Sequence, residues 1–402
     1  MLSYHDALAK IRQIVAGAAP SPPVETLRLE HALGRVLAEN VAADRDYPPF
    51  HRSTRDGFAV RSPDLASVPA GLTQRGEIRA GEHFEGKLGP GECVAIMTGA
   101  PLPAGSDAVV MLEHAHVDGN TVKMDRGVAA RENVVVQGSE ARKGDLVLRR
   151  GRRLGAGEIG LLASVGKSHV SAFLPPQVAI LPTGDEVVPV DHHPEWFQVR
   201  NSNALALAAQ VTVAGGVPRV LAIARDDCDV LRRLIEEGLE SDLLVLTGGV
   251  SKGKYDFVRQ VLNDLGAEFH VENVAIRPGK PLVFGQVKGK RFFGLPGTPV
   301  STYVTFEIFV RPALAQIGGG VWEDPIFFRA RLAEPFRQKL GLTVFMPARV
   351  ETHDGGPVVR LVGWQGSGDL VGVAAANCFL VVHPAQTDLA AGDWVDVMPK
   401  NQ

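Results

Sequence analysis

The chain has 402 residues, of which 45% are hydrophobic and 22% are charged, and its formal net charge is −3. These proportions are ordinary for a soluble globular protein, and the length predicts two to four domains. The small net charge excludes a general attraction for nucleic acid, so an anionic ligand would need a local basic cluster. Three widely spaced cysteines without a C-x-x-C pair argue against a zinc site and a disulfide framework. Because the sequence has neither an apolar signal segment nor a long apolar run, we expect a cytoplasmic protein that spans no membrane.

The N-terminal part of the chain begins with a helical pattern. Residues 3–16 predict an amphipathic helix, because Leu8, Ile11 and Val15 fall on one face. A second helical pattern covers residues 154–165. We therefore expect an N-terminal helical and linker domain, built from residues 1–45 and 141–171.

The segment between these two pieces has a different character. Residues 46–140 contain short apolar runs, frequent glycines and the hairpin signal Asp118-Gly119. These features predict a small β domain.

The central part of the chain alternates apolar strands with helices. Continuous apolar strands in this arrangement predict a mostly parallel sheet that is covered on both faces. The expected strands cover residues 178–181, 220–224, 243–246, 282–285 and 292–295. We assign residues 172–318 to this α/β domain and residues 326–402, where short alternating runs return, to a C-terminal β domain.

Polar residues gather where the strands of the α/β domain end. Ligands of such sheets bind outside the carboxyl ends of the strands. From Gly248 the chain matches G-x-x-x-x-G-K, but Tyr255 stands where a P-loop has Ser or Thr. Each polar turn by itself could be a solvated loop, whereas five at one edge indicate a site. Carboxylates together with Lys and Arg there suit a phosphorylated ligand that carries Mg²⁺.

Eight segments together resemble the molybdopterin molybdenumtransferases, the family of MoeA and the gephyrin E domain. They occur in the family's order, cover nearly the whole chain and form a highly specific set. They are PPFHRSTRDGFAV (48–60), IMTGAPLPAGSDAVVMLE (96–113), PTGDE (182–186), NSN (201–203), TGGVSKGKYDF (247–257), RPGKPLVFG (277–285), GLPGTPVS (294–301) and QGSGDL (365–370).

The resemblance implies a fold and a reaction. The fold is multidomain α/β and β, with a central molybdopterin-binding α/β domain, a small β domain, a mixed helical segment and a C-terminal β-barrel-like domain. In the reaction, adenylylated molybdopterin and molybdate become molybdenum cofactor and AMP with the help of Mg²⁺. A homodimer is implied, and molybdopterin adenylyltransferase and molybdoenzyme maturation proteins are possible partners, without nucleic acid or membrane.

The resemblance also assigns roles to single residues. The acids for metal and nucleotide chemistry are Asp56, Glu186, Asp226 and Asp256, of which Asp56, Glu186 and Asp256 are the expected metal ligands. The expected pterin and nucleotide contacts are Thr98, Asn203, Gly248, Gly249 and Ser251. The expected molybdate contacts are Arg277, Lys280, Ser301, Arg349 and Ser367.

The chain departs from the family pattern at a few positions. Arg277 stands where many members have Lys, and Thr298 replaces a common Asn. Glu140 remains as a possible acid, although the basic run that often precedes it is missing.

Other functions remain open at the level of sequence. They are a non-catalytic molybdopterin-binding scaffold, a tungstate-inserting paralogue, and a nucleotide hydrolase or deamidase. The presence of all four expected acids favours an enzyme over a scaffold, and a hydrolase leaves the segments 48–60 and 365–370 unexplained.

Overall fold

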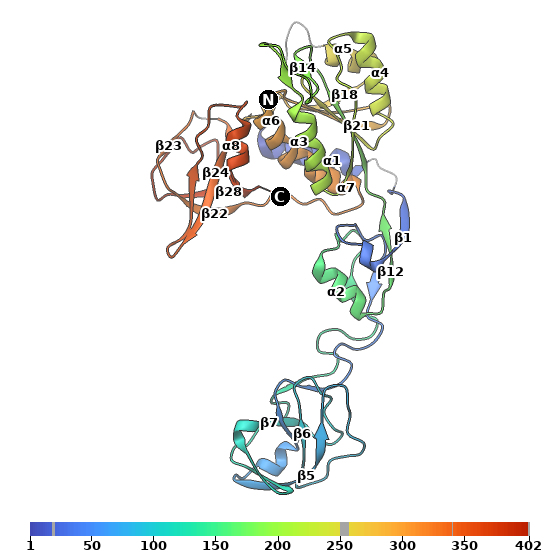
Figure 1. The fold of residues 1–402 in the computed structure, drawn as a ribbon, viewed down its shortest axis with the longest axis vertical. Helices are drawn as coiled ribbons and strands as arrows, with labels where there is room; N and C mark the ends of the chain where they lie inside the picture. Colours follow the sequence, from blue (N-terminus) through green and yellow to red (C-terminus); the bar gives the residue numbers. More distant parts are fainter. Residues whose placement is uncertain (18–20, 250–256, 340, 401–402) are drawn as a thin grey trace.

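The computed structural model describes residues 1–402 except 18–20, 250–256, 340 and 401–402. The molecule is elongated, with the small β domain at one end and the α/β and C-terminal β domains at the other (Figure 1). The expected multidomain architecture is confirmed. No helix in the described part of the chain is both long and apolar enough to cross a membrane.

The small β domain is built on a six-stranded sheet with the strand order β7-β4-β6-β5-β9-β8. Its strands are β4 (Gly57–Val60), β5 (Ala70–Ile78), β6 (Glu92–Ile96), β7 (Ala108–Met111), β8 (Ala115–Asp118) and β9 (Thr121–Met124). The expected hairpin joins β8 to β9, but its two turn residues are Gly119 and Asn120, one position later than the Asp-Gly signal. Short 3₁₀ turns follow β4 (Ser62–Leu65) and β7 (Leu112–His114), and β3 (Arg52–Ser53) pairs with β10 (Val134–Val135).

The helical and linker domain joins two distant parts of the chain by antiparallel pairing. Strand β1 (Val24–Arg28) pairs with β12 (His169–Phe173), and β2 (Val41–Ala42) pairs with β11 (Leu146–Leu148). A 3₁₀ turn (Leu29–His31) and the helix α2 (Ala156–Ser164) pack around a small core. The residues of the small β domain lie between these two paired parts in the sequence.

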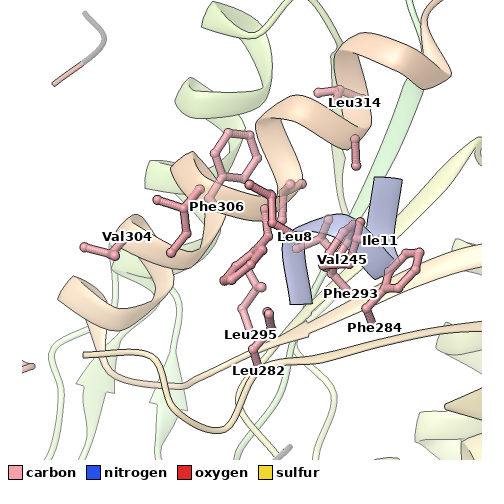
Figure 2. Packing of buried hydrophobic residues seen from close by; sticks show 14 of the residues in the cluster. Leu8, Ile11, Val245, Leu282, Phe284, Phe293, Leu295, Val304, Phe306 and Leu314 are labelled. Carbon is pink, nitrogen blue, oxygen red and sulfur yellow. The ribbon is translucent and has the colours of Figure 1, made fainter. Parts of the chain in front are cut away.

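The first helix belongs elsewhere than expected. Helix α1 (Tyr4–Gly17) forms as predicted, but its buried residues Leu8, Ile11 and Val15 join the core of the α/β domain rather than that of the linker domain. Figure 2 shows Leu8 and Ile11 beside Val245 and Phe293. The assignment of residues 4–17 to the linker domain was therefore wrong, because the apolar face of an isolated helix matches any apolar surface.

The α/β domain contains a six-stranded sheet with the order β16-β13-β17-β21-β20-β18. The strands are β13 (Gln177–Pro182), β16 (Val217–Val220), β17 (Leu243–Thr247), β18 (Glu268–Glu272), β20 (Val283–Val287) and β21 (Lys290–Leu295). Strands β16, β13, β17 and β21 pair in parallel, β20 runs opposite to them, and β18, which pairs antiparallel with β20, runs in the same direction as the first four. The helices are α3 (Ser202–Val213), α4 (Cys228–Gly238), α5 (Phe257–Asp264), α6 (Pro299–Thr305) and α7 (Arg311–Ile317), with a π-helical turn (Phe306–Val310) between the last two. Separate apolar clusters confirm that both faces of the sheet are covered.

One predicted strand is displaced. The apolar run 220–224 was expected to form a strand, but β16 ends at Val220. From the pair Ile180–Val220 to the isolated bridge Thr183–Ala224, one chain advances three residues and the other four. The extra residue interrupts the regular pairing, as in a β-bulge.

The C-terminal domain closes into a five-stranded barrel, which confirms the barrel-like expectation. Its strands are β22 (Phe328–Leu332), β24 (Thr343–His353), β25 (Gly356–Leu361), β26 (Cys378–Val382) and β28 (Trp394–Pro399), and the pairing of β24 with both β25 and β26 completes the closure. The domain also contains α8 (Leu370–Ala375) and a small pair of β23 (Phe336–Arg337) with β27 (Asp388–Leu389). Strand β19 (Ile276–Arg277) leaves the α/β domain and pairs with β24, so the two domains share a sheet.

Candidate functional site

The carboxyl ends of three central strands lie side by side. In the sheet register Pro182 of β13 pairs with Thr247 of β17, and Thr247 pairs with Leu295 of β21. The backbone continues this contact beyond the strands, since Thr183 N donates to Thr247 O (3.0 Å) and Gly248 N donates to Leu295 O (3.2 Å). The turns that follow the three strands therefore meet at one edge.

Glycine is required in the turn after β17. Gly248 and Gly249 have φ angles of +93° and +62°, which side chains rarely tolerate. A Cβ atom on Gly248 would lie 2.7 Å from Thr183 O, and one on Gly249 would lie 2.7 Å from Val258 Cγ2. The backbone of this turn thus packs directly against the turn after β13.

Asn203 connects two of the turns. From the first turn of α3, its Nδ2 donates to Thr247 Oγ1 (3.1 Å) and to Gly297 O (2.8 Å). Its Oδ1 is buried and has no hydrogen-bond partner among the described residues. Since a buried acceptor without a partner is costly, this oxygen is a natural contact for a ligand that binds at the edge.

Three carboxylates gather beside these turns. Asp226 N donates to Asp185 Oδ1 (3.3 Å), and the Glu186 carboxylate folds back over Gly184, where an added Cβ would meet Glu186 Oε2 at 2.5 Å. Partial burial raises the pKa of Asp226 above its ordinary value, and the charges of Asp185 and Glu186 raise it further. Mutual repulsion of this kind favours a cation or a shared proton.

The N-terminus of α6 brings the expected oxyanion contacts from two domains together. Ser301 is buried and accepts a hydrogen bond from Thr298 Oγ1 (2.8 Å). The neighbouring Val300 N donates to the carbonyl oxygen of Ser367 (2.9 Å), so the 363–369 loop of the barrel rests on this helix. Ser301 and Ser367 are therefore brought together.

Lys280 and Arg277 lie in the segment that enters the antiparallel strand β20. Because β20 runs opposite to β21, this segment reaches the same sheet edge as the three turns. A Cβ atom on Gly279 would lie 2.5 Å from Thr305 Cγ2, so the backbone beside Lys280 packs on α6. Both basic side chains are exposed.

Arg349 lies farther along the barrel. Arg277 pairs with Val344 in β24, and Arg349 is five residues beyond it, or roughly 17 Å along an extended strand. Its Nε donates to Glu351 Oε1 (3.2 Å), and its side chain is 58% exposed. The 363–369 loop begins beside this part of β24, because Val362 N donates to Pro347 O (3.3 Å). The loop that carries Ser367 therefore starts near the part of β24 that contains Arg349. Among the interactions that the structure describes, none joins Arg349 to Arg277 or Lys280.

Asp56 and Thr98 lie in the small β domain, which is at the opposite end of the molecule from this sheet edge (Figure 1). Asp56 Oδ1 accepts hydrogen bonds from Thr98 N (2.7 Å) and Thr98 Oγ1 (2.9 Å). The two hydrogen bonds hold the pKa of Asp56 below its ordinary value, and the bond from the backbone N–H of Thr98 has the larger effect. Within one chain the structure joins Asp56 to Thr98 but not to Glu186 or Asp226.

Three family models together match most of the chain. Residues 2–166 match the family described as the MoeA N-terminal region (domain I and II), residues 179–316 the probable molybdopterin binding domain, and residues 329–400 the MoeA C-terminal region (domain IV). The molybdopterin molybdenumtransferase of Staphylococcus aureus (strain COL) is 33% identical over 393 residues, which cover 96% of this chain and 93% of the relative. This chain belongs to the molybdopterin molybdenumtransferase (MoeA) family.

Further relatives agree with this membership. The molybdopterin molybdenumtransferase of Staphylococcus epidermidis (strain ATCC 12228) is 34% identical over 380 residues, covering 92% of this chain and 90% of the relative. Two crystal structures of molybdopterin biosynthesis MoeA proteins from Pyrococcus horikoshii match with TM-scores of 0.71 and 0.79 at 32% and 26% identity. They cover 99% and 100% of both chains, respectively.

Some expected residues of this MoeA-family chain lie outside the described residues. These are Asp256 and Ser251, together with Lys252 and Lys254 of the P-loop-like segment. Among the residues that are described, no three His, Cys, Asp or Glu side chains form a group that could hold a metal ion by themselves. Mg²⁺ commonly takes only one or two protein carboxylates and completes its shell with phosphate oxygens and water, so a pair among Asp185, Glu186 and Asp226 fits that chemistry.

Two residues have roles that sequence reasoning did not assign. Asp185 was not among the expected site residues, yet it contacts Asp226, and its carbonyl oxygen accepts from Arg225 Nη1 (2.7 Å). Its position beside Glu186 in the TGDE turn was the available signal. Glu140, left as a possible acid, instead pairs with Arg52 Nη2 (3.0 Å) in the small β domain.

Proposed function

We propose that this MoeA-family protein inserts molybdate into adenylylated molybdopterin with the help of Mg²⁺ and releases AMP. The observation that carries the proposal is the single edge where three strand ends, the acids Asp226 and Glu186, and the barrel loop at Ser367 converge. A substrate with a phosphoanhydride at one end and a metal-binding dithiolene at the other needs both kinds of contact in one cleft.

The acidic part of the edge suits the nucleotide end of the substrate. Cleavage of a phosphoanhydride requires that the charge on the phosphate oxygens be neutralised. Mg²⁺, when bound, would supply this neutralisation from carboxylates such as Glu186 and Asp226, with Asp256 as a further expected ligand. The Gly248-Gly249 turn brings backbone close to the phosphates, and the unpaired Asn203 Oδ1 accepts a hydrogen bond from a donor group of the substrate.

The junction with the barrel suits the oxyanion. Molybdate carries two negative charges, and binding it without water requires several charge-assisted donors. Lys280 and Arg277 supply charge from the α/β domain, Arg349 supplies it from the barrel, and the hydroxyl groups of Ser301 and Ser367 donate hydrogen bonds. In the free protein Arg349 is occupied by Glu351, so its contact with molybdate requires the exchange of one anion for another.

A homodimer is part of the proposal. Asp56 and Thr98 lie at the far end of the chain from the sheet edge, although the resemblance assigns them to the same cleft. A second copy that presents its small β domain to this edge completes the site, and the arrangement is symmetric for both chains. Molybdopterin adenylyltransferase and molybdoenzyme maturation proteins remain the proposed partners for delivery and acceptance.

The direct test is a turnover assay. The purified protein is incubated with adenylylated molybdopterin, Mg²⁺ and molybdate, and the release of AMP is followed by chromatography. We expect AMP to appear only when molybdate and Mg²⁺ are both present. Binding of the adenylylated pterin without any AMP release would identify a non-catalytic scaffold instead. AMP release that does not depend on molybdate would indicate a nucleotide hydrolase, and a preference for tungstate in the same assay would identify a tungstate-inserting enzyme.

A further inference from the structure

Two exposed aromatic side chains lie in a loop beside the candidate site. Trp196 is 93% exposed and Phe197 is 57% exposed, although large aromatic side chains are usually the best candidates for burial. Their rings pack edge to face with centroids 5.6 Å apart. The pair thus forms a preformed aromatic surface that nothing in the described part of the chain covers.

The backbone fixes this pair near the acids of the sheet edge. Strand β14 (Val187–Val188) directly follows Glu186, and β15 (Val199–Arg200) runs parallel to it. Val199 N donates to Glu186 O (2.9 Å). Because Trp196 is only three residues before Val199, its backbone lies within roughly 11 Å of this hydrogen bond.

The loop that carries the aromatic pair has ordered ends. Gln198 N donates to Glu195 O (3.0 Å), which closes a turn around Trp196 and Phe197, and Arg200 Nε donates to His192 O (3.1 Å). On its C-terminal side the loop continues into Asn201, which caps α3 by accepting from Ala204 N (3.2 Å). The loop is therefore closed by its own hydrogen bonds and leads into α3, the helix that carries Asn203.

The same loop forms one wall of an apolar pocket of about 480 Å³. Val187 and Val190 line it from the loop side, and Leu205 and Ile223 line it from the opposite side. The polar residues in the lining are Asn201 and Arg225. Arg225 also contacts the acidic turn, because its Nη1 donates a hydrogen bond to Asp185 O. A pocket with apolar walls and a few polar groups at the rim is the usual form of a site for a small organic ligand.

We propose that this pocket, together with the Trp196–Phe197 pair, receives a planar heterocyclic ring of the adenylylated pterin substrate, either adenine or pterin. The inference rests on the proposed function. The pocket lining itself contains no aromatic residue, whereas the exposed pair on the adjoining loop offers a surface on which a flat ring can stack. Stacking tolerates any flat ring, whereas the polar rim with Asn201 and Arg225 selects its edge. Trp196 and Phe197 are therefore binding residues that orient the substrate while the acids act on its phosphates.

The test uses the full-length protein and the two rings as separate probes. Binding of AMP and of pterin-6-carboxylate is measured by calorimetry for the wild type and for Trp196→Ala, Trp196→Phe and Leu205→Gln. Loss of one stacked ring should weaken the binding of one probe roughly 5- to 150-fold. Trp196→Phe should retain most of the affinity because it keeps a flat ring, and Leu205→Gln should weaken the same probe. The matched control is Trp394→Ala, which removes an exposed tryptophan of the barrel and should change neither affinity.

A kinetic measurement separates this role from a structural one. In the AMP-release assay, Trp196→Ala should raise KM for the adenylylated pterin, with kcat and the half-saturating molybdate concentration nearly unchanged. Equal affinities of the wild type and Trp196→Ala for both probes would overturn the inference, even if the wild type turns over normally. Dissociation of the dimer by Trp196→Ala would also overturn it, because the pair would then belong to a subunit contact. Failure of the proposed function would look different, as the wild type would release no AMP.

Discussion

At the scale of single residues, the candidate site depends on positions where only one side chain fits the geometry. Gly248 and Gly249 have left-handed backbone angles, and their missing side chains leave room for the turn after β13. Asp226 is the opposite case, because its carboxylate is retained in surroundings that disfavour its charge. Such residues lower stability and are typical of functional sites.

Gly248→Ala should therefore destabilise the protein. The new Cβ would lie 2.7 Å from Thr183 O at a φ of +93°, which we expect to cost roughly 1–3 kcal/mol. Thermal unfolding measures the change. The control is Gly157→Ala in α2, where nothing lies within 4 Å of the added Cβ, so that this change should stabilise the helix by about 0.5–1 kcal/mol. A neutral or stabilising Gly248→Ala would contradict the crowding of the turn.

Asp226→Asn should raise the melting temperature at pH 7 while it abolishes AMP release. The pKa of Asp226 is raised in the folded state, so the charged carboxylate costs stability as the pH rises from the unfolded pKa through the folded one. Asparagine does not carry this charge. The difference in Tm between variant and wild type should shrink as the pH falls from the raised folded pKa to the unfolded one, and should be absent well below both, where the carboxyl group is protonated in both states. An Asn variant that is less stable than the wild type at pH 7 would show that the carboxylate is stabilised by its surroundings.

At the scale of elements, the N-terminal helix connects parts of the molecule that lie far apart in the sequence. Tyr4 of α1 packs against Phe309 of the π-helical turn and Phe345 of β24, with ring centroids 5.9 Å and 5.8 Å away. The apolar face with Leu8 and Ile11 covers the sheet (Figure 2). This helix therefore packs against both the α/β domain and the barrel, the two domains that carry the expected oxyanion contacts.

Ile11→Ala should destabilise the α/β domain by about 2–5 kcal/mol, because Ile11 is completely buried and the change leaves a cavity. The measurement is scanning calorimetry, in which the transition of the α/β domain should shift while that of the small β domain stays in place. Arg12→Ala, one residue along on the exposed side of the same helix, is the control and should change little. If the Ile11 variant instead shifted only the linker domain, the packing of α1 would be different from that described.

A second feature at the scale of elements is the barrel strand β24, together with the loop that contains Ser367. Arg349→Ala should remove one charge-assisted contact to molybdate, worth roughly 1.5–3 kcal/mol, or about 10- to 150-fold in affinity. We expect a raised half-saturating molybdate concentration with nearly unchanged binding of the adenylylated pterin. Arg337→Ala, which removes an exposed ion-paired arginine elsewhere in the barrel domain, is the control. Equal half-saturation in the wild type and Arg349→Ala would leave Arg349 as a surface residue paired with Glu351.

At the scale of the whole molecule, elongation separates the proposed halves of the site. The small β domain with Asp56 and Thr98 stands away from the α/β domain, and the linker domain lies between them (Figure 1). In a symmetric dimer each chain would give its small β domain to one site and its sheet edge to the other.

Two inactive variants should therefore restore each other. Asp56→Asn and Asp226→Asn chains are mixed under conditions that exchange subunits, and AMP release is measured. Random pairing makes half of the dimers mixed, and one of the two sites in each mixed dimer has both native residues, so activity should return to about one quarter of the wild-type value. No recovery, with subunit exchange verified by differential tags, would place both residues of a working site on one chain.

The sequence by itself determined the order of the domains, most elements and the residue types of the site. Local patterns sufficed for these features: the face of Leu8 and Ile11 predicts a helix, continuous apolar runs predict the central strands, and eight segments identify the family. The rule that ligands bind at the carboxyl ends of parallel strands also predicts Glu186, Asp226 and Gly248 at one edge. These inferences succeeded because periodicity and turn chemistry act over a few residues.

Only the tertiary structure decided which surfaces meet. In the structure α1 packs in the α/β core rather than in the linker domain, β16 ends at Val220, and Asp56 lies far from Glu186. The sequence could not predict these features, because the sequence of an apolar face or a strand edge does not specify the surface that it packs against. It also brought Asp185 to Asp226 and left Trp196 in solvent beside the site. Contacts of this kind arise from the packing of distant segments, and their energies depend on neighbours that no local pattern contains.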